Sequence, residues 1–154
     1  MLLDLFIQRI IWPLFDKILV IGKGPAQDWF AQKIPEAIFA GFQSGPDLGR
    51  AVASMDILFN PSTTETFGNV TLEAMASAVP VVAARAAGSE SLIIDNHNGI
   101  LAAPGNTQEF AKALEDYIEN PALRDAHGQA GETLSRSYDW DNINQSVADK
   151  YIDI

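Results

Sequence analysis

The sequence predicts a Rossmann-like α/β domain, a parallel sheet with helices on both faces, followed by a helical C-terminal tail. Its 154 residues have the length of one typical domain, and the 47% hydrophobic and 19% charged composition is that of a folded protein. Short apolar runs alternate regularly with helix-like segments up to Pro104. These runs are almost continuously apolar, which is typical of parallel strands that are buried on both faces.

Five apolar runs, each bounded by glycine or proline, are expected to form the strands. They cover residues 17–22, 37–41, 55–61, 79–84 and 99–104. Helices are expected between them at residues 26–33, 46–54 and 69–78, with a short piece near residues 89–94. Because no repeat or internal linker interrupts this order, residues 1–154 are expected to form a single domain.

The segment after Pro104 has a helical pattern. Asn106 or Thr107 is expected to cap one helix, and Pro121 occupies a first-turn position of the next. Residues 138–154 are expected to supply a last helix.

Residues 1–16 are apolar, but neither a membrane span nor a signal segment is expected there. Asp4 and Arg9 are charged, Pro13 interrupts the run, and a spanning helix needs about 20 mostly apolar residues. No small-residue cleavage site follows a basic leader. We expect a short amphipathic helix that ends near Trp12, and a cytoplasmic location.

The composition excludes several classes of function. The net charge is −10 with a pI near 4.4, which argues against binding nucleic acid or docking on anionic lipid by charge alone. The chain has no cysteine, and its two histidines have no ligand partners at useful spacing. The acids of "DWD" at residues 139–141 are better explained as helix caps than as metal ligands. No metal and no cofactor are therefore expected.

The stretch "FNPSTTETFGNVTLEAMASAVPVVAARAAG", residues 59–88, has the pattern of a binding site. Glu65 lies in the loop after an expected strand, at the sheet edge where parallel α/β folds bind ligands. Asn69 can cap the following helix with its side-chain oxygen. The free amides near Gly68, Asn69 and Val70 would form an anion site at the positive end of the helix dipole.

Glu73 is the only charged residue between Thr66 and Ala84, and it comes about one turn into that helix. A phosphate at the amides and a carboxylate about 6 Å further on would match a phosphate joined to a ribose, since a carboxylate can accept two hydrogen bonds from a diol. The alternative is that Glu73 only complements the helix dipole and points to solvent. Glu65 taken alone would be an ordinary loop acid.

These residues resemble the C-terminal, donor-binding half of retaining GT-B glycosyltransferases, the group 1 family that includes bacterial GDP-mannose-dependent mannosyltransferases. The resemblance rests first on the E-x7-E pattern from Glu65 to Glu73, which is followed by "AMAS". It also rests on "VIGKGP" (20–25), "FAGF" (39–42), "NPSTTETFGN" (60–69), "PVVAA" (80–84) and "NGILAAPGN" (98–106), which match in order and spacing. It runs from about Lys17 to the end of the chain.

The resemblance implies a role for each residue of the site. Glu65 would be the catalytic residue that contacts the donor sugar's hydroxyls, and Glu73 would bind the ribose hydroxyls. The donor-binding set comprises Glu65, Thr66, Phe67, Gly68, Asn69, Val70 and Glu73, with Gly41, Phe42 and Gln43 beside the nucleobase. Lys23 and Arg85 are candidates for contact with phosphate.

Some features of the sequence depart from the family pattern. Nothing in residues 1–16 matches the Gly-Arg…Lys-Gly segment whose basic residues neutralise the diphosphate in the family, and by the resemblance the N-terminal acceptor domain is expected to be absent from these 154 residues. Ala78 and Ala87 stand where the family usually has glycine. Ser91, next to Glu90, stands where the family usually has an acid.

The expected function is metal-independent transfer of a hexose from a GDP- or UDP-sugar, with retention, to an unidentified lipid or glycan acceptor. Contact with the membrane surface is expected only for the intact enzyme. Two alternatives remain open at this point. The chain could be a truncated, inactive fragment, or it could be a non-catalytic module that pairs with a separate N-terminal half or with itself.

Overall fold

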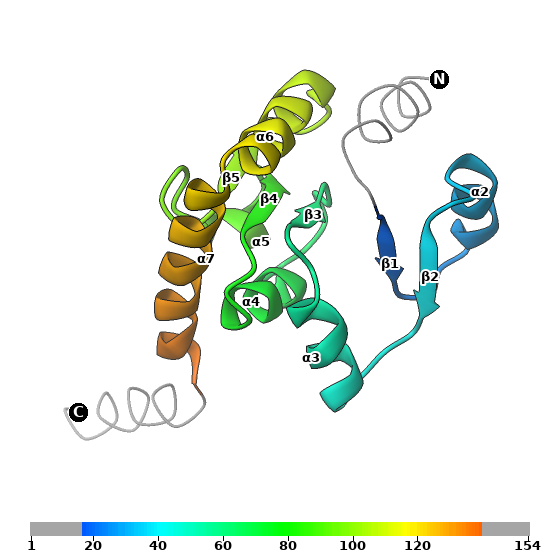
Figure 1. Cartoon of the computed structure of the whole chain (residues 1–154), viewed down its shortest axis with the longest axis horizontal. Helices are drawn as coiled ribbons and strands as arrows, with labels where there is room; N and C mark the ends of the chain where they lie inside the picture. The colour runs from blue at the N-terminus through cyan, green and yellow to red at the C-terminus, as the bar shows by residue number, and fades with distance from the viewer. Residues whose placement is uncertain (1–16, 140–154) are drawn as a thin grey trace.

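The structure is a computed structural model, and it describes residues 17–139 (Figure 1). The strands are β1 (Leu19–Ile21), β2 (Ile38–Gly41), β3 (Leu58–Asn60), β4 (Val81–Ala84) and β5 (Ile100–Ala102). The helices are α2 (Gln27–Lys33), α3 (Gly45–Ala53), α4 (Asn69–Ala76), α5 (Ala87–Glu90), α6 (Thr107–Glu119), α7 (Pro121–Ser135) and the 3-10 helix η3 (Arg136–Tyr138). The helix expected up to Trp12 and the last helix beyond residue 139 lie outside the described residues.

The alternation of strands and helices is confirmed, and each strand lies within its predicted run. The helix after Ala84 differs from the expectation, because α5 covers Ala87–Glu90 instead of residues 89–94. None of the helices in residues 17–139 is long and apolar enough to cross a membrane.

The strands form two parallel sheets instead of one. β1 pairs with β2, while β4 lies between β3 and β5. β4 is the centre of the larger sheet, and every one of its residues is buried. Its side chains alternate between the two faces, as the period of two in a strand requires.

Each face of the larger sheet carries its own core, which confirms helices on both sides. Val82 and Ala84 pack with the buried face of α6, including Phe110 and Leu114. On the opposite face, Val81 and Ala83 of β4 pack with Ala74 and Met75 of α4 and with Val52 of α3. The carboxyl ends of β3 and β4 are therefore held between two layers of helices.

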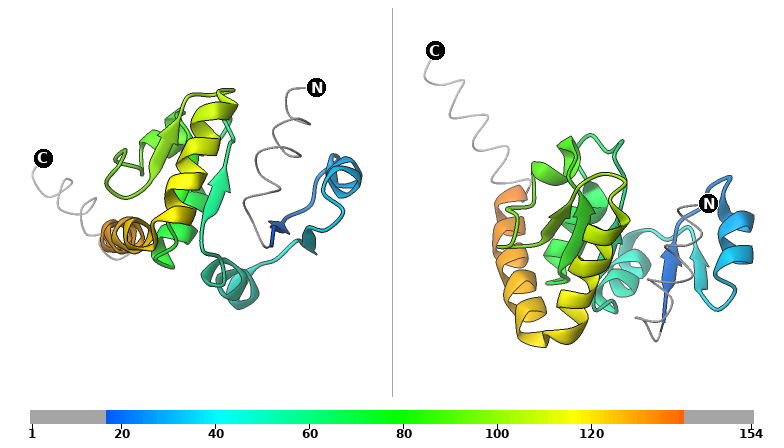
Figure 2. Two further views of the ribbon diagram at one scale, coloured as in Figure 1. Left: turned by 45° about the horizontal axis from the view of Figure 1, so that its top comes forward. Right: turned by 90° about the horizontal axis from the view of Figure 1, so that it is seen from above.

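The smaller sheet is less buried than the sequence predicts. Neither β1, α2 nor β2 contains a buried residue, and Ile38 is 53% exposed. Figures 1 and 2 show this unit standing apart from the larger sheet. The apolar pattern of these two runs therefore predicted the strands correctly but predicted their burial wrongly. The described helices do not cover both faces of this sheet of two strands.

The caps predicted after Pro104 are confirmed. The side chain of Asn106 accepts a hydrogen bond from the backbone N–H of Glu109, which satisfies one free amide of α6. Pro121 is in the first turn of α7, where its missing N–H costs nothing. Asn120 ends α6 and caps α7, accepting from the N–H of Leu123 at 3.1 Å.

Helix α7 packs closely on the end of α4 through two glycines (Figure 2). A Cβ at Gly128 would lie only 2.2 Å from the carbonyl oxygen of Ala78. A Cβ at Gly131 would lie 3.3 Å from the side chain of Met75, within the buried cluster of α4. The C-terminal helix thus supports the helix that begins at the predicted binding loop.

His127 is a core residue held by a tyrosine. Its Nδ1 lies 2.8 Å from the hydroxyl of Tyr117, and both side chains are buried between α6 and α7. Burial lowers the pKa of His127 because the charged form would lose its hydration. The histidine therefore links α6 to α7 through its contact with Tyr117.

We expect Ala78→Gly to stabilise the protein. Ala78 follows α4 with φ of 54°, a left-handed conformation that costs an L-residue about 1–2 kcal/mol and costs glycine almost nothing. The greater freedom of glycine in the unfolded chain offsets part of this gain, which leaves about 0.5–1 kcal/mol. Urea unfolding should show a higher midpoint for Ala78→Gly and a lower one for Ala76→Gly, which lies within the helix. A lower midpoint for both variants would contradict this account.

Candidate functional site

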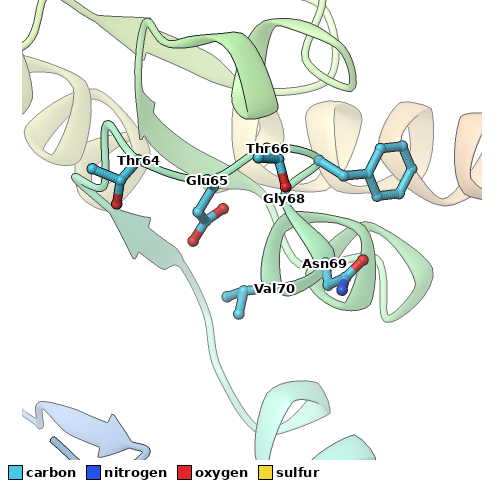
Figure 3. A pocket seen from close by; sticks show the side chains of 7 residues that line it. Thr64, Glu65, Thr66, Gly68, Asn69 and Val70 are labelled. Carbon is cyan, nitrogen blue, oxygen red and sulfur yellow. The ribbon is translucent and has the colours of Figure 1, made fainter.

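The candidate site is the loop between β3 and α4. A pocket of about 320 Å³ is lined by seven consecutive residues, Thr64, Glu65, Thr66, Phe67, Gly68, Asn69 and Val70. In Figure 3 the carboxylate of Glu65 points from the loop toward the first turn of α4, where Val70 lies. The pocket thus contains six of the predicted donor-binding residues and adds Thr64, which the sequence analysis missed.

Glu65 is half-buried and is held from the strand below it. The amide Nδ2 of Asn60, the last residue of β3, donates a hydrogen bond to Oε2 of Glu65 at 3.1 Å. The loop backbone is held from the other side by α5, because a Cβ at Gly88 would lie 2.6 Å from the carbonyl oxygen of Glu65. Glycine at this position therefore allows α5 to touch the loop that carries the carboxylate.

Gly68 forms the junction between the loop and α4. It precedes the helix with φ of 85° and ψ of 49°, in the left-handed region that glycine adopts without strain. Asn69 is already the first residue of the helix, and no side chain caps α4, so the predicted capping by Asn69 is wrong. The amides of the first turn keep no partner within the helix itself, as at any helix start.

Glu73 lies one turn into α4 and is exposed. Desolvation of its carboxylate raises the pKa of Glu73 above the ordinary glutamate value. It does not line the pocket of Thr64–Val70. Its position along the helix agrees with the predicted spacing from the amides, and its ribose contact stays a prediction.

The other predicted contacts lie on separate elements. Gly41 ends β2 with a φ of 67°, and Phe42 after it is 70% exposed. The amide of Gln43 donates to the carbonyl oxygen of Ala40 at 2.6 Å, which folds the loop back on its strand. None of these residues lines the pocket formed by the 64–70 loop, so their place beside a nucleobase stays a prediction.

The two candidate phosphate ligands differ in their surroundings. Arg85 forms an ion pair of 2.6 Å with Asp95 and donates to the carbonyl oxygen of Leu101. The Asp95 carboxylate raises the pKa of Arg85 through this hydrogen bond. Lys23 is exposed in the turn after β1. Arg85 would have to share its guanidinium with Asp95 to bind a phosphate.

Two positioning contacts were not predicted from the sequence. The first is the contact of Asn60 with Glu65, which the sequence could have indicated because Asn60 is a polar residue at the end of the apolar run "DILFN". The ring of Phe67 also meets Tyr138 from η3 edge-on, with centroids 5.8 Å apart. This second contact had no signal, because the two residues are brought together only by the packing of α7 on α4.

Within residues 17–139, no group of three or more His, Asp or Glu side chains could hold a metal ion. Asp139 follows η3 in an extended conformation, and Asp141 lies outside the described residues. The site described above consists of the Glu65 carboxylate, which is hydrogen-bonded to Asn60, the left-handed Gly68 and the start of α4.

Comparison with known proteins gives matches over most of the chain. The family model described as glycosyl transferases group 1 matches residues 1–120, so the match includes the first residues, which the resemblance in sequence left out. Sulfoquinovosyl transferase SQD2 of Arabidopsis thaliana is 35% identical over 129 residues, which are 80% of this chain and 25% of that protein. A GDP-mannose-dependent alpha-mannosyltransferase of Corynebacterium glutamicum is 28% identical over 138 residues, 90% of this chain and 33% of that protein.

Solved structures match in fold as well. Anabaena Alr3699/HepE in complex with UDP has a TM-score of 0.79 and 29% identity, covering 90% of this chain and 41% of that one. The C-terminal domain of LpcC, a glycosyl transferase group 1 family protein from Francisella tularensis, has a TM-score of 0.71 and 28% identity, covering 88% of this chain and 75% of that one.

The chain spans about a quarter to a third of the length of the two curated relatives named above. The family model nevertheless matches well over half of this chain, including the whole loop from β3 to α4. The chain belongs to the glycosyl transferases group 1 family.

Proposed function

We propose that this chain is the donor-binding part of a glycosyltransferase and that it binds a nucleotide sugar at the 64–70 loop and the first turn of α4. The observation that carries the proposal is the geometry of Glu65. Its carboxylate accepts a hydrogen bond from Asn60 and points toward the start of α4, which follows directly after the left-handed Gly68. A fixed acceptor beside free helical amides suits a ligand that joins hydroxyl groups to a phosphate.

The roles of the two glutamates follow from this arrangement. The diphosphate would lie against the amides of Asn69 and Val70, which the left-handed turn at Gly68 exposes. Glu65 would then accept hydrogen bonds from the sugar hydroxyls on one side. Glu73, one turn along α4, would accept hydrogen bonds from the ribose hydroxyls on the other side of the diphosphate. Gly41, Phe42 and Gln43 would lie beside the base.

The charge of a departing nucleotide diphosphate must be stabilised by fixed dipoles or cations. The start of α4 supplies the dipole, and the exposed side chains of Lys23 and Arg85 are the candidate cations. We propose that no metal takes part, and that none of the roles assigned to Glu65 and Glu73 requires one.

The donor is a GDP- or UDP-sugar, and the family-level reaction is hexosyl transfer with retention. The names of the relatives support both nucleotides, since one is a GDP-mannose-dependent mannosyltransferase and a structural neighbour was crystallised with UDP-glucose. The acceptor, a lipid or a glycan, and a cytoplasmic location belong to the intact enzyme. Because the matched relatives are longer than this chain, we propose that transfer needs further protein to bind the acceptor.

A second candidate function is that of a module that pairs with another chain or with itself. It is favoured by the apolar side chains of the β1–α2–β2 unit, among which Ile38 is 53% and Trp29 is 37% exposed. Size-exclusion chromatography over a range of concentrations would detect self-association. A monomer at every concentration that still binds a nucleotide sugar would favour the donor-binding function.

Calorimetry with UDP, GDP, UDP-glucose and GDP-mannose tests the proposed function. We expect one nucleotide series to bind, and we expect no sugar transfer to any acceptor by this chain alone. Replacing magnesium by EDTA should leave the affinity within about twofold, which is well below one tenfold step of 1.4 kcal/mol. Absence of binding would contradict the proposed function, and a large loss in EDTA would contradict its independence of metal.

A further inference from the structure

Asn60 is a buried polar residue at the carboxyl end of β3, and both ends of its amide are engaged. It is 8% exposed. Its Oδ1 accepts a hydrogen bond from the backbone N–H of Ser62 at 3.2 Å. Its Nδ2 donates to Glu65 Oε2 at 3.1 Å and lies 3.5 Å from Thr71 Oγ1 on α4.

These partners fix the orientation of the amide. The N–H of Ser62 can only donate, so it requires the oxygen of Asn60 on its side. The NH2 group is consequently turned toward Glu65, whose carboxylate can only accept when it is ionised. Aspartate has nearly the same shape as asparagine but could satisfy only the first of these two partners.

We propose that Asn60 is a positioning residue of the donor site, which holds Glu65 so that its remaining lone pairs face the hydroxyls of the donor sugar. This inference rests on the proposed function. The amide occupies one position on Oε2, and a carboxylate offers about four such positions on its two oxygens, so the others stay open to a ligand. The bond from Asn60, at 3.1 Å, restricts the rotation of the Glu65 side chain.

A purely structural role for Asn60 makes a different prediction. Asn60 also ties β3 to the loop at Ser62 and lies near α4 at Thr71, so its loss could loosen the whole loop. In that case the nucleotide and the sugar would lose affinity together. If Asn60 acts through Glu65, the loss falls on the sugar alone, because the amides of α4 and Glu73 bind the nucleotide.

The central variant is Asn60→Asp, which keeps the bond from Ser62 and replaces the bond to Glu65 by repulsion between two carboxylates. Affinities for UDP, GDP, UDP-glucose and GDP-mannose are measured by calorimetry on the full chain. We expect about a tenfold loss for the sugar nucleotide that binds the wild type, as for one lost hydrogen bond to a charged group. The matching free nucleotide should change by no more than about twofold.

Asn98→Asp is the matched control. Asn98 is 1% exposed, accepts from the N–H of Ile94 and donates to the carbonyl oxygen of Leu92, so the same substitution also removes a buried amide donor there. Within residues 17–139, the side-chain hydrogen bonds of Asn98 involve no residue of the 64–70 loop. Thermal unfolding of both variants shows whether they lose similar stability, and only Asn60→Asp should lose selectivity for the sugar nucleotide.

A double-mutant cycle with Glu65→Gln completes the test. If Asn60 acts through Glu65, Asn60→Asp should cost no further sugar affinity once the carboxylate is gone. The double variant also allows the test if Asn60→Asp alone does not fold. In the double variant the side-chain amide introduced by Glu65→Gln can donate a hydrogen bond to the carboxylate introduced by Asn60→Asp, which removes the repulsion between two carboxylates. Asn60→Ala, which brings in no charge, should show the same selective loss.

Three results would overturn the inference while leaving the proposed function intact. The first is that Asn60→Asp binds the sugar nucleotide as tightly as the wild type does. The second is that Asn60→Asp loses affinity equally for the free nucleotide and the sugar nucleotide. The third is that Asn60→Asp lowers the affinity for the sugar nucleotide by the same factor when Glu65→Gln is already present. A wild-type chain that binds the free nucleotide as tightly as the sugar nucleotide would instead overturn the sugar contact of Glu65, and the role of Asn60 with it.

Discussion

Glu73→Gln is expected to weaken nucleotide binding by about 10- to 150-fold while changing the stability of the fold little. A carboxylate that accepts two ribose hydroxyls makes charge-assisted hydrogen bonds, which contribute about 1.5–3 kcal/mol, and each 1.4 kcal/mol is tenfold in affinity. Glutamine keeps the shape and one acceptor, so the smaller end of the range is expected. Calorimetry with GDP and UDP gives the affinities, and thermal unfolding gives the stability.

The control for this change is Glu119→Gln, because Glu119 is also exposed on a helix and lies at the end of α6. The 2′-deoxynucleotides provide a second comparison, since losing one hydroxyl should weaken the wild type more than Glu73→Gln. If Glu73 only complemented the helix dipole, the substitution would cost about 0.3–1 kcal/mol of stability and leave the affinity unchanged. Equal losses with the deoxynucleotide in both proteins would mean that Glu73 does not touch the ribose.

The raised pKa of Glu73 gives this prediction a pH dependence. In the proposed function the ionised form of Glu73 binds the ribose, so the affinity of the wild type should fall as the pH drops through the pKa of Glu73. Because that pKa is raised, the fall should begin at a higher pH than for a fully solvated glutamate. Glu73→Gln should lack this component, and subtracting its pH profile removes the titration of the phosphates.

Gly128→Ala is expected to destabilise the protein by about 1–3 kcal/mol or more, the usual cost of overpacking. The new Cβ would lie 2.2 Å from the carbonyl oxygen of Ala78, which belongs to the backbone and cannot rotate aside. Helix α7 must then move away from α4, and the contact of Tyr138 with Phe67 in the 64–70 loop should loosen with it. Urea unfolding measures the lost stability, and nucleotide affinity reports on the loop.

Gly49→Ala is the matched control, because Gly49 lies within α3 and a Cβ there would meet nothing within 4 Å. Alanine is favoured over glycine inside a helix, so this variant should gain about 0.5–1 kcal/mol. Opposite signs for the two identical substitutions would establish that the packing of α7 on α4 requires glycine. A gain in stability for Gly128→Ala would contradict the described contact.

The sequence contains nearly all the information about the individual elements. Strand runs, helix periods and the caps at Asn106 and Pro121 depend on interactions between neighbours in the chain, so their signals lie in short windows. The position of the helix that follows the 64–70 loop was predicted for the same reason. Its cap was not, because glycine and asparagine are both common N-cap residues, and only the backbone angles show that Gly68 precedes the helix and Asn69 begins it.

The sequence determined that residues 64–70 join a strand to a helix and that two glutamates stand eight residues apart around that helix start. Only the tertiary structure decided which groups hold Glu65, because Asn60 and Gly88 reach it from other elements. It also divided the strands into two sheets and left the apolar side chains of β1 and β2 only partly covered. Side-chain hydrogen bonds and burial depend on which distant segments meet in space, and the hydrophobic pattern of a strand gives the direction of its side chains without naming what will cover them.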